Sequence, residues 1–226
     1  MESERQIVGD KEVNPYRLKI NDYNGRLFDT HTFGRPLKSD IFQSLFSQQT
    51  VYLEIGSGSG AHLIERARRE PSASWIGIER RFKRAVRTIE KATERGVDQV
   101  FVARADVQDV LPVVPENSLD GIYLLFPDPW PKPRHWKNRF FSGDNLKRLA
   151  PLIKEGGFFC FKTDHRDYYQ WALKELQSQS VFKVIRHSAD IYQDRKPEEE
   201  IRSEFENLFL SKNEPVAEIL LQKEGL

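Results

Sequence analysis

Cysteine, long apolar runs and an excess of either charge are all scarce in this sequence, and each scarcity excludes a class of protein. Cys160 is the single cysteine among 226 residues, which excludes a disulfide framework and a cysteine-based zinc site. One free thiol fits a reducing compartment, so we expect a cytoplasmic protein. No stretch approaches the ~18 apolar residues of a membrane span, and residues 1–11 lack the apolar core of a signal peptide. The sequence therefore predicts no membrane partner.

The charges almost cancel, which limits how the chain can bind an acidic partner. There are 35 basic and 34 acidic residues, a net charge of +1, so a uniformly cationic binder is excluded. A local basic patch is compatible with this average. Hydrophobic residues make up 38% of the chain, which is enough to build a core and excludes wholesale disorder.

Short apolar runs alternate with amphipathic segments along most of the chain. The expected strands are 51–55, 75–78, 100–103, 122–126, 158–162, 182–186 and 217–221. The expected helices are 37–46, 61–69, 82–94, 145–152 and 168–177. This alternation predicts an α/β fold with a mostly parallel, seven-stranded sheet that carries helices on both faces. Residues 1–35 show neither the helical nor the strand period of apolar residues. They are predicted to form an N-terminal arm ahead of one domain at 36–226.

A glycine-rich turn joins the first expected strand to the helix after it. Residues 51–61 read VYLEIGSGSGA. Gly56 and Gly58 permit a tight turn and let a ligand approach the backbone closely. With Ala61 in the sixth position, the turn matches G-x-G-x-x-G/A, a pattern of dinucleotide-binding folds. The pattern alone does not choose the nucleotide, and a plain strand-to-helix turn stays the alternative.

Acidic residues recur at the ends of successive expected strands, where ligands bind in parallel sheets. Glu54 lies two residues before the glycine turn, Glu79 ends the second strand, and Asp106 follows the third. Glu79 can accept both hydroxyls of a ribose, and Asp106 can accept a hydrogen bond from an adenine amino group. Glu54 would repel the pyrophosphate of NAD, whereas it would attract the ammonium and sulfonium of S-adenosylmethionine. The three carboxylates therefore favour S-adenosylmethionine.

The most unusual stretch follows the fourth expected strand, where residues 125–139 read LFPDPWPKPRHWKNR. Its prolines stiffen the backbone and hold Asp128 at the end of a strand. The run from Lys132 to Arg139, which includes Arg134, interleaves cations with tryptophan, and such residues bind phosphates and stack on bases. A proline-stiffened, solvated loop is the alternative. No metal is expected, because His135 has no second ligand at a useful spacing.

Several motifs together resemble a known family. The segments LEIGSGSG, GIE, ARADV, FPDPWPKPRHWKNRF, FKTDH and SEFE occur in the order found in the tRNA (guanine-N7-)-methyltransferases. The resemblance runs from about residue 30 to the C-terminus, and the proline–tryptophan stretch is its most specific part. It implies a Rossmann-like class I methyltransferase fold. It also implies methyl transfer from S-adenosylmethionine to N7 of the guanine at position 46, in the variable loop of tRNA.

The resemblance also implies roles for individual residues. The positions that match family contacts to S-adenosylmethionine or to the reacting centre are Glu54, Glu79, Asp106 and Asp128. The positions that match substrate contacts are Lys132, Asp164 and the segment from Ser203 to Glu206, and we expect Arg134 to anchor a nearby phosphate. The family usually shows Thr-x-Tyr/Phe-Glu at that segment. Ser203 keeps the hydroxyl of the threonine and loses its methyl group. The sequence is compatible with a monomer or a homodimer.

The implied reaction places a specific demand on Asp128. Guanine N7 carries a lone pair and no proton, so its methylation needs no general base. Positive charge moves from sulfur to the purine as the methyl group transfers. Asp128 is therefore expected to act as the catalytic residue through its charge, and to hold the amino group of the base.

Three other functions fit parts of the sequence. The segment from Phe126 to Trp130 superficially resembles the Asp/Asn-Pro-Pro-Tyr motif of exocyclic-amine methyltransferases, although its order differs. A Rossmann-like RNA-binding module without catalysis would have lost the cofactor carboxylates, which this chain keeps. An NAD-dependent oxidoreductase is disfavoured by Glu54 and by the basic, aromatic loop.

Overall fold

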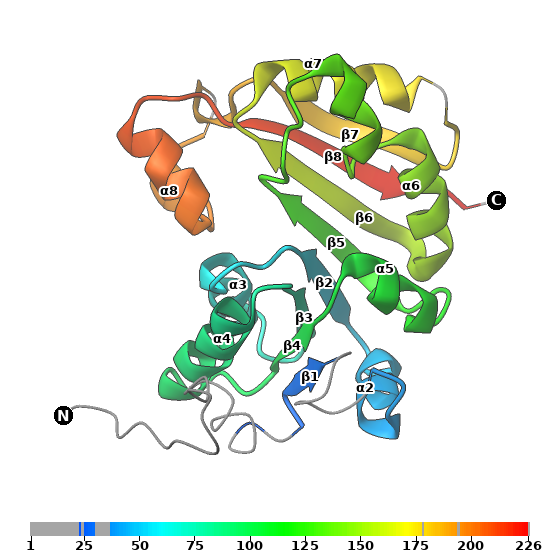
Figure 1. Ribbon diagram of the computed structural model, residues 1–226, viewed down its shortest axis with the longest axis vertical. Helices are drawn as coiled ribbons and strands as arrows, with labels where there is room; N and C mark the ends of the chain where they lie inside the picture. The colour runs from blue at the N-terminus through cyan, green and yellow to red at the C-terminus, as the bar shows by residue number, and fades with distance from the viewer. Residues whose placement is uncertain (1–22, 24, 30–36, 178, 194, 226) are drawn as a thin grey trace, which may run out of the picture.

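The structure is a computed structural model, which describes residues 23, 25–29, 37–177, 179–193 and 195–225. Eight strands form one sheet in the order β1-β4-β3-β2-β5-β6-β8-β7 (Figure 1). They are β1 (Leu27–Asp29), β2 (Val51–Ile55), β3 (Ser74–Ile78), β4 (Val100–Arg104), β5 (Leu119–Leu125), β6 (Ile153–Thr163), β7 (Phe182–Ser188) and β8 (Ala217–Lys223). The strands from β1 to β6 pair in parallel, while β8 runs antiparallel to both of its neighbours.

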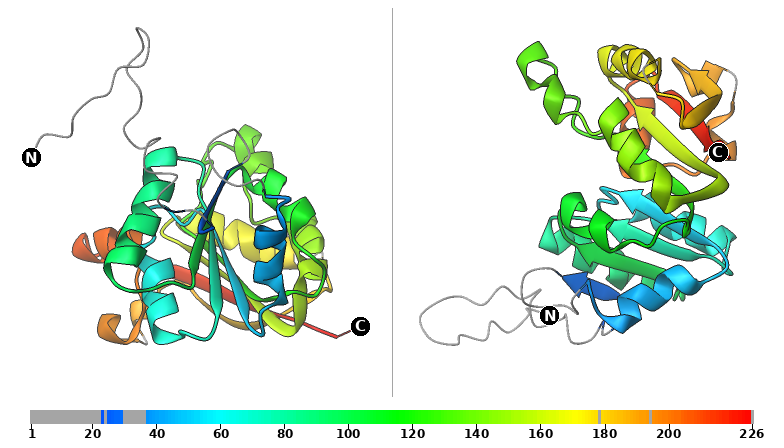
Figure 2. Two further views of the ribbon diagram at one scale, coloured as in Figure 1. Left: turned by 90° about the horizontal axis from the view of Figure 1, so that it is seen from below. Right: turned by 90° about the vertical axis from the view of Figure 1, so that its right-hand side faces the viewer.

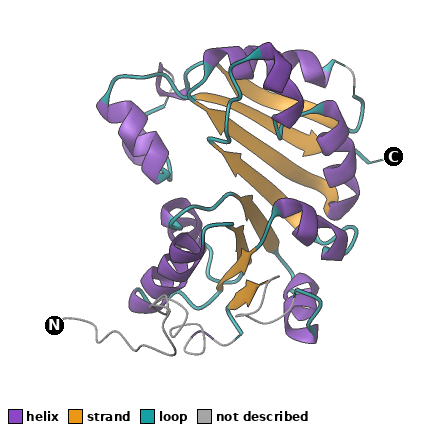
Figure 3. Cartoon of the chain, viewed as in Figure 1, coloured by secondary structure: helices purple, strands orange, loops and turns teal. Residues whose placement is uncertain are grey.

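Helices cover both faces of the sheet (Figure 3). The helices are α2 (Asp40–Ser44), α3 (Ala61–Arg69), α4 (Phe82–Glu94), α5 (Val107–Val110), α6 (Gly143–Leu149), α7 (Arg166–Leu176) and α8 (Glu204–Ser211). One core cluster joins the sheet to α2, α5, α6 and α7, and a second joins the other face to α3 and α4. The central strands are buried on both faces, which explains why they are continuous apolar runs in the sequence. The predicted α/β architecture is confirmed.

The predicted number of strands is wrong by one. Leu27, Phe28 and Asp29 form β1, which pairs with β4 and is buried. Arg26 anchors this edge by donating hydrogen bonds to the carbonyls of Val97 and Val100. Three residues are too few to display a strand period, so the sequence pattern could not reveal β1. Residues 1–22, 24 and 30–36, which include the predicted boundary of the arm at residue 35, lie outside the described residues.

The order of the strands determines where a ligand can bind. From β2, the chain moves outward to β3 and β4 and then returns to the other side of β2 as β5. Ligands of doubly wound sheets bind outside the carboxyl ends of the strands at such a reversal. Within the described ranges, no helix is both long and apolar enough to cross a bilayer.

Candidate functional site

The glycine turn follows β2 and opens α3. Gly56, Gly58 and Gly60 have φ values of 76°, 59° and 79°, in the left-handed region that favours glycine. A Cβ on Gly60 would lie 2.4 Å from Cγ2 of Thr88 in α4. Glycine at this position therefore lets α3 and α4 pack closely, and it directs the start of α3 toward the carboxyl edge of the sheet.

Two adjoining cavities lie at this edge. The smaller one, of about 240 Å³, is lined by Glu54, Gly56, Gly58 and residues of α8. The larger one, of about 520 Å³, is lined by Glu79, Asp106 and Asp128. The residues that line both cavities are Gly56, Arg84, Leu125 and Phe205. The four carboxylates predicted to bind the cofactor thus line two adjoining cavities across the ends of β2, β3, β4 and β5.

Two of these carboxylates are buried, a costly placement unless each has a partner. The side chain of Glu54 is in contact with His62, whose Nδ1 lies 2.8 Å from Oε2 of Glu54. Glu79 accepts a hydrogen bond of 2.6 Å from the backbone N–H of Arg81. Asp106 is more exposed, caps α5 by accepting from the N–H of Gln108, and lies 3.5 Å from Arg80.

The loop that carries Asp128 has an unusual backbone. Phe126 and Trp130, on either side of the Pro127–Pro129 segment, have φ values of 51° and 44°. Bulky residues rarely adopt this left-handed conformation, and strain of this kind gathers at functional sites. Two hydrogen bonds help to hold the loop, from the N–H of Phe126 to the carbonyl of Lys162 and from Nε of Arg139 to the carbonyl of Pro129. Asp128 itself is exposed and lines the larger cavity.

The basic run lies next to Asp128, although not all of it faces solvent. Lys132 and Arg134 are exposed at the start of the 3₁₀ helix η4 (Pro133–Asn138), which projects away from the sheet in the right-hand view of Figure 2. Arg139 is only 1% exposed. Its guanidinium lies 4.7–5.0 Å from the ring centroids of Trp136, Tyr168 and Trp171. The expectation that Arg139 contacts phosphate is therefore wrong, because aromatic rings enclose its charge.

The Ser203–Glu206 segment begins α8 as a capping box. Oγ of Ser203 accepts from the N–H of Glu206, and the carboxylate of Glu206 accepts from the N–H of Ser203. Glu206 is fully buried, lies 2.9 Å from Nζ of Lys162, and accepts a hydrogen bond of 2.5 Å from Tyr192. Burial acts to lower the pKa of Lys162, but the charge of Glu206, its hydrogen bond and the charge of Glu200 help to outweigh burial together, so this pKa is raised. Ser203 lines the smaller cavity.

Two further contacts hold α8 against the glycine turn. Oγ of Ser59 donates a hydrogen bond to the carboxylate of Glu204, and Nζ of Lys91 lies 3.2 Å from the same oxygen. The hydrogen bond from Ser59 and the charge of Lys91 lower the pKa of Glu204. Helix α8 therefore forms a wall of the smaller cavity.

Asp164 does not line the cavities at the sheet edge. It directly follows β6 and is half-buried. The structure thus brings the predicted cofactor residues and Ser203 to the cavities at one edge of the sheet, whereas four predicted substrate residues line neither cavity: Lys132, Arg134, Asp164 and the buried Glu206. Among the described residues, no group of three His, Cys, Asp or Glu side chains could hold a metal ion.

Comparison with known proteins identifies the family. A family described as putative methyltransferase matches residues 48–219. A tRNA (guanine-N(7)-)-methyltransferase of Bdellovibrio bacteriovorus is 30% identical over 186 residues, which cover 82% of this chain and 88% of that protein. The chain belongs to the tRNA (guanine-N7-)-methyltransferase family. The family member of Rhizobium etli is 41% identical over 140 residues, or 62% of this chain, and the chain spans 61% of its length.

A solved structure supports the methyltransferase fold. The 16S rRNA methyltransferase KamB aligns with a TM-score of 0.61 over 83% of this chain and 94% of its own, at 17% identity. At this identity the likeness concerns the fold alone. The Rossmann-like class I methyltransferase fold implied by the motifs is confirmed.

Sequence reasoning missed several residues that line the candidate site. Arg84 of α4 and Phe205 of α8 line both cavities, and His62 of α3 contacts Glu54. Phe205 falls inside the SEFE motif, which could have indicated it. Arg84 is one of two arginines on the amphipathic helix α4, and its place at the site depends on which face of that helix is turned toward the sheet edge.

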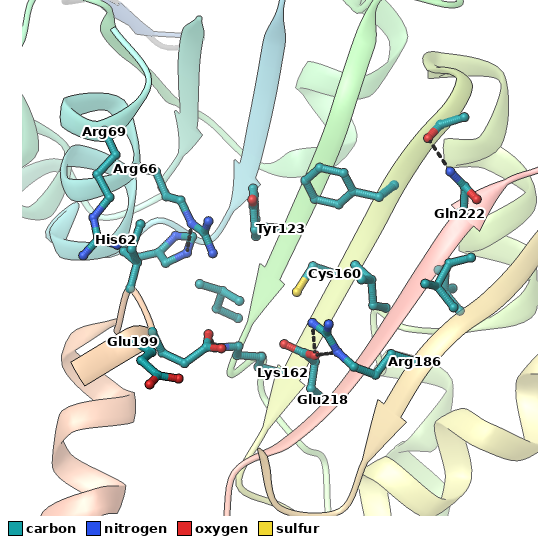
Figure 4. Close-up of a pocket in the computed structure, with 18 residues that line it drawn as sticks. His62, Arg66, Arg69, Tyr123, Cys160, Lys162, Arg186, Glu199, Glu218 and Gln222 are labelled. Carbon is teal, nitrogen blue, oxygen red and sulfur yellow. Dashed lines mark hydrogen bonds and ion pairs between the residues drawn. The ribbon is translucent and has the colours of Figure 1, made fainter. Parts of the chain in front are cut away.

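A third cavity, of about 430 Å³, lies on the sheet face beside α3 (Figure 4). Charged side chains line it, including Arg66, Arg186 and Glu218. Arg186 is paired with Glu218 at 2.9 Å. The predicted carboxylates Glu79, Asp106 and Asp128 do not line this cavity, so we place the candidate active site at the sheet edge.

Proposed function

We propose that this protein is a tRNA (guanine(46)-N7)-methyltransferase that uses S-adenosylmethionine. One observation carries the proposal: buried and exposed carboxylates line two adjoining cavities at the strand ends, next to an exposed basic loop. A cationic donor with a ribose and an adenine, together with an anionic acceptor, matches this pairing of charges.

The residues at the site fit the proposed donor. Glu54 and Glu79 are 3% and 7% exposed and both line a cavity. We assign Glu54 to the ammonium of the methionine end and Glu79 to the ribose hydroxyls. Asp106, beyond Glu79 in the larger cavity, is assigned to the adenine. Gly56 and Gly58 provide a turn without side chains along which such a ligand can lie.

Asp128 is assigned to the acceptor side. When bound, S-adenosylmethionine supplies a methyl group on a sulfonium, which N7 attacks directly. Asp128 holds the amino edge of guanine and places a negative charge near the purine as the purine becomes positive. Holding the two reactants in line supplies much of the rate, up to roughly 7–11 kcal/mol in favourable cases. The residue needs no proton-accepting role, because N7 has no proton to lose.

The exposed loop is assigned to the RNA. Lys132 and Arg134 reach solvent beside Asp128, where they can bind phosphates of the variable loop. Ser203 is proposed to close the pocket from the C-terminal side together with Phe205, which takes the place predicted for Glu206 because Glu206 is fully buried. Asp164 is proposed to contact the edge of the guanine. We further propose that the protein works in the cytoplasm, as a monomer or a homodimer.

Nucleoside analysis tests this function. An unmodified tRNA transcript is incubated with the protein and methyl-labelled S-adenosylmethionine, then digested and separated. We expect N7-methylguanosine, and no label in a transcript with adenine at position 46. Label on an exocyclic amine would instead identify the protein as an amine methyltransferase. Wild-type protein that binds the transcript but transfers no label would favour the RNA-binding module.

A further inference from the structure

A buried histidine links Glu54 to an arginine on the opposite side of the glycine turn. His62 occupies the second position of α3 and is 2% exposed. Its Nδ1 lies 2.8 Å from Oε2 of Glu54, and its Nε2 lies 3.2 Å from Nε of Arg66. His62 lines both the smaller cavity at the sheet edge and the third cavity on the sheet face. The imidazole therefore lies between two charged groups of opposite sign.

The hydrogen bonds define the protonation of this histidine. Nε of arginine only donates, so Nε2 of His62 accepts. The ring proton is then on Nδ1, which donates to Glu54. Helical spacing explains the second contact, because residues four positions apart lie on the same face of a helix. Tyr123 fixes the group from the sheet side, with its ring centroid 5.0 Å from that of His62 and 5.2 Å from the guanidinium of Arg66 (Figure 4).

We propose that His62 is a positioning residue for Glu54, which holds the carboxylate at the donor cavity and separates it from Arg66. This inference rests on the proposed function, because it assumes that Glu54 binds the ammonium of the donor. The described residues provide Glu54 with one hydrogen-bond partner, His62, through Oε2. Oε1 is thereby left for the ligand.

Loss of the imidazole would change the charge that the donor meets. The carboxylate of Glu54 and the guanidinium of Arg66 would face each other across the space that the ring had filled. Opposite charges in a partly buried site attract strongly. A direct ion pair between them would turn the carboxylate toward Arg66 and neutralise it, so the ammonium of the donor would lose its partner. His62 thus keeps Glu54 available without sharing its charge.

Leucine and asparagine form a matched pair of substitutions at this position. They have the same branched shape, but asparagine keeps an N–H donor near the place of Nδ1 and leucine has none. The probes are S-adenosylhomocysteine, which has the ammonium, and 5′-methylthioadenosine, which keeps the adenine and ribose but lacks the amino-acid end. Calorimetry measures the affinity of each probe for wild type, His62→Leu and His62→Asn.

We expect His62→Leu to weaken S-adenosylhomocysteine binding about tenfold or more, with 5′-methylthioadenosine binding changed less than twofold. His62→Asn should bind S-adenosylhomocysteine within about threefold of wild type. Equal losses for both probes, or none for His62→Leu, would overturn the proposal. If His62→Leu does not fold, His62→Ala provides the same comparison without added bulk. Wild-type protein that binds neither probe would refute the proposed function itself, which separates that failure from the failure of His62.

Discussion

Single carboxylates at the sheet edge carry most of the proposed chemistry. Glu79 is buried, and one of its oxygens accepts a hydrogen bond from the N–H of Arg81. If it also binds both ribose hydroxyls, Glu79→Ala removes two charge-assisted hydrogen bonds, each worth roughly 1.5–3 kcal/mol. We expect calorimetry to show at least a hundredfold loss of S-adenosylmethionine affinity. Glu94→Ala, at the exposed end of α4, is the control and should bind normally. Unchanged affinity in Glu79→Ala would remove this residue from the donor site.

A substitution of Asp128 distinguishes two mechanisms, stabilisation of the transition state by its charge and general-base catalysis. Asp128→Asn keeps the size and one acceptor of the side chain and removes its charge. If the charge stabilises the transition state, the single-turnover rate should fall by about two or more orders of magnitude, with donor and tRNA affinities nearly unchanged. The wild-type rate should also stay flat from about pH 6 to 9, since N7 needs no base. A wild-type rate in the variant would direct attention to Asp164.

The sequence predicts where a residue lies when that position depends on a local motif. Glu54, Glu79 and Asp106 could be located because Glu54 lies near the end of a recognisable strand and the other two follow one, and the carboxyl ends of parallel strands meet at one edge. His62 gave no such signal, because its role depends on a contact across the turn. Arg139 was misassigned for a related reason. Two of the rings around its guanidinium belong to Tyr168 and Trp171 of α7, about thirty residues further along the chain.

The basic loop is proposed to bind RNA through several residues together. Lys132 and Arg134 are both exposed beside Asp128. Counterions are released when cations bind phosphates, so tRNA affinity should fall as salt rises. Replacing Lys132 and Arg134 by alanine should flatten the logarithmic salt slope by about two. The control is the double variant Lys174→Ala and Lys183→Ala, which removes two exposed lysines from α7 and β7. Equal slopes in the test variant and wild type would mean that the loop faces away from RNA.

Arg139 connects that loop to α7. Nε donates to the carbonyl of Pro129, while the two terminal nitrogens of the guanidinium have no hydrogen-bond partner among the described residues. Burial lowers the pKa of this guanidinium. A buried ion without a full set of partners contributes little net stability. Arg139→Met should therefore lower the free energy of unfolding by no more than about 2 kcal/mol.

Arg139→Met should lower the single-turnover rate strongly while it changes the free energy of unfolding only modestly. Without its donor, the Pro129 carbonyl no longer anchors the loop, so Asp128 is less precisely placed. A displacement of about 1 Å can cost roughly a hundredfold in rate. Urea unfolding and single-turnover kinetics on the same preparation measure both effects. A stable variant with a wild-type rate would show that the prolines alone hold the loop.

At the scale of the whole molecule, an ionic network joins the last strand to the segment before α8. Glu218 of β8 is 2% exposed and lies 2.8 Å from Arg195 and 2.9 Å from Arg186. Glu200 lies 2.9 Å from Arg195 and 3.4 Å from Lys162. The network could not be predicted from the sequence, because its members come from β6, β7, β8 and an irregular segment. It fixes the position from which α8 closes the site.

The network gives the fold a pH dependence of known sign. Burial acts to raise the pKa of Glu218, but the hydrogen bond from Arg195 and the nearby cations outweigh it, so this pKa is lowered below 4.5. The pKa of Glu200 is lowered in the same way, with burial opposing Lys162 and Arg195. A carboxyl with a lowered folded pKa adds stability above its unfolded pKa and loses it as pH falls through the folded value.

Stability should therefore hold at neutral pH and decline below about pH 4.5. Glu218→Gln removes one of the two shifted carboxylates. We expect it to be about 1–3 kcal/mol less stable than wild type at pH 7, and to show a smaller loss between pH 4.5 and pH 3. Urea midpoints at pH 7, 4.5 and 3 measure this difference. Glu198→Gln, at an exposed position in the same segment, is the control and should follow the wild-type curve. Parallel curves for Glu218→Gln and wild type would show that the acid sensitivity of the fold arises outside this network.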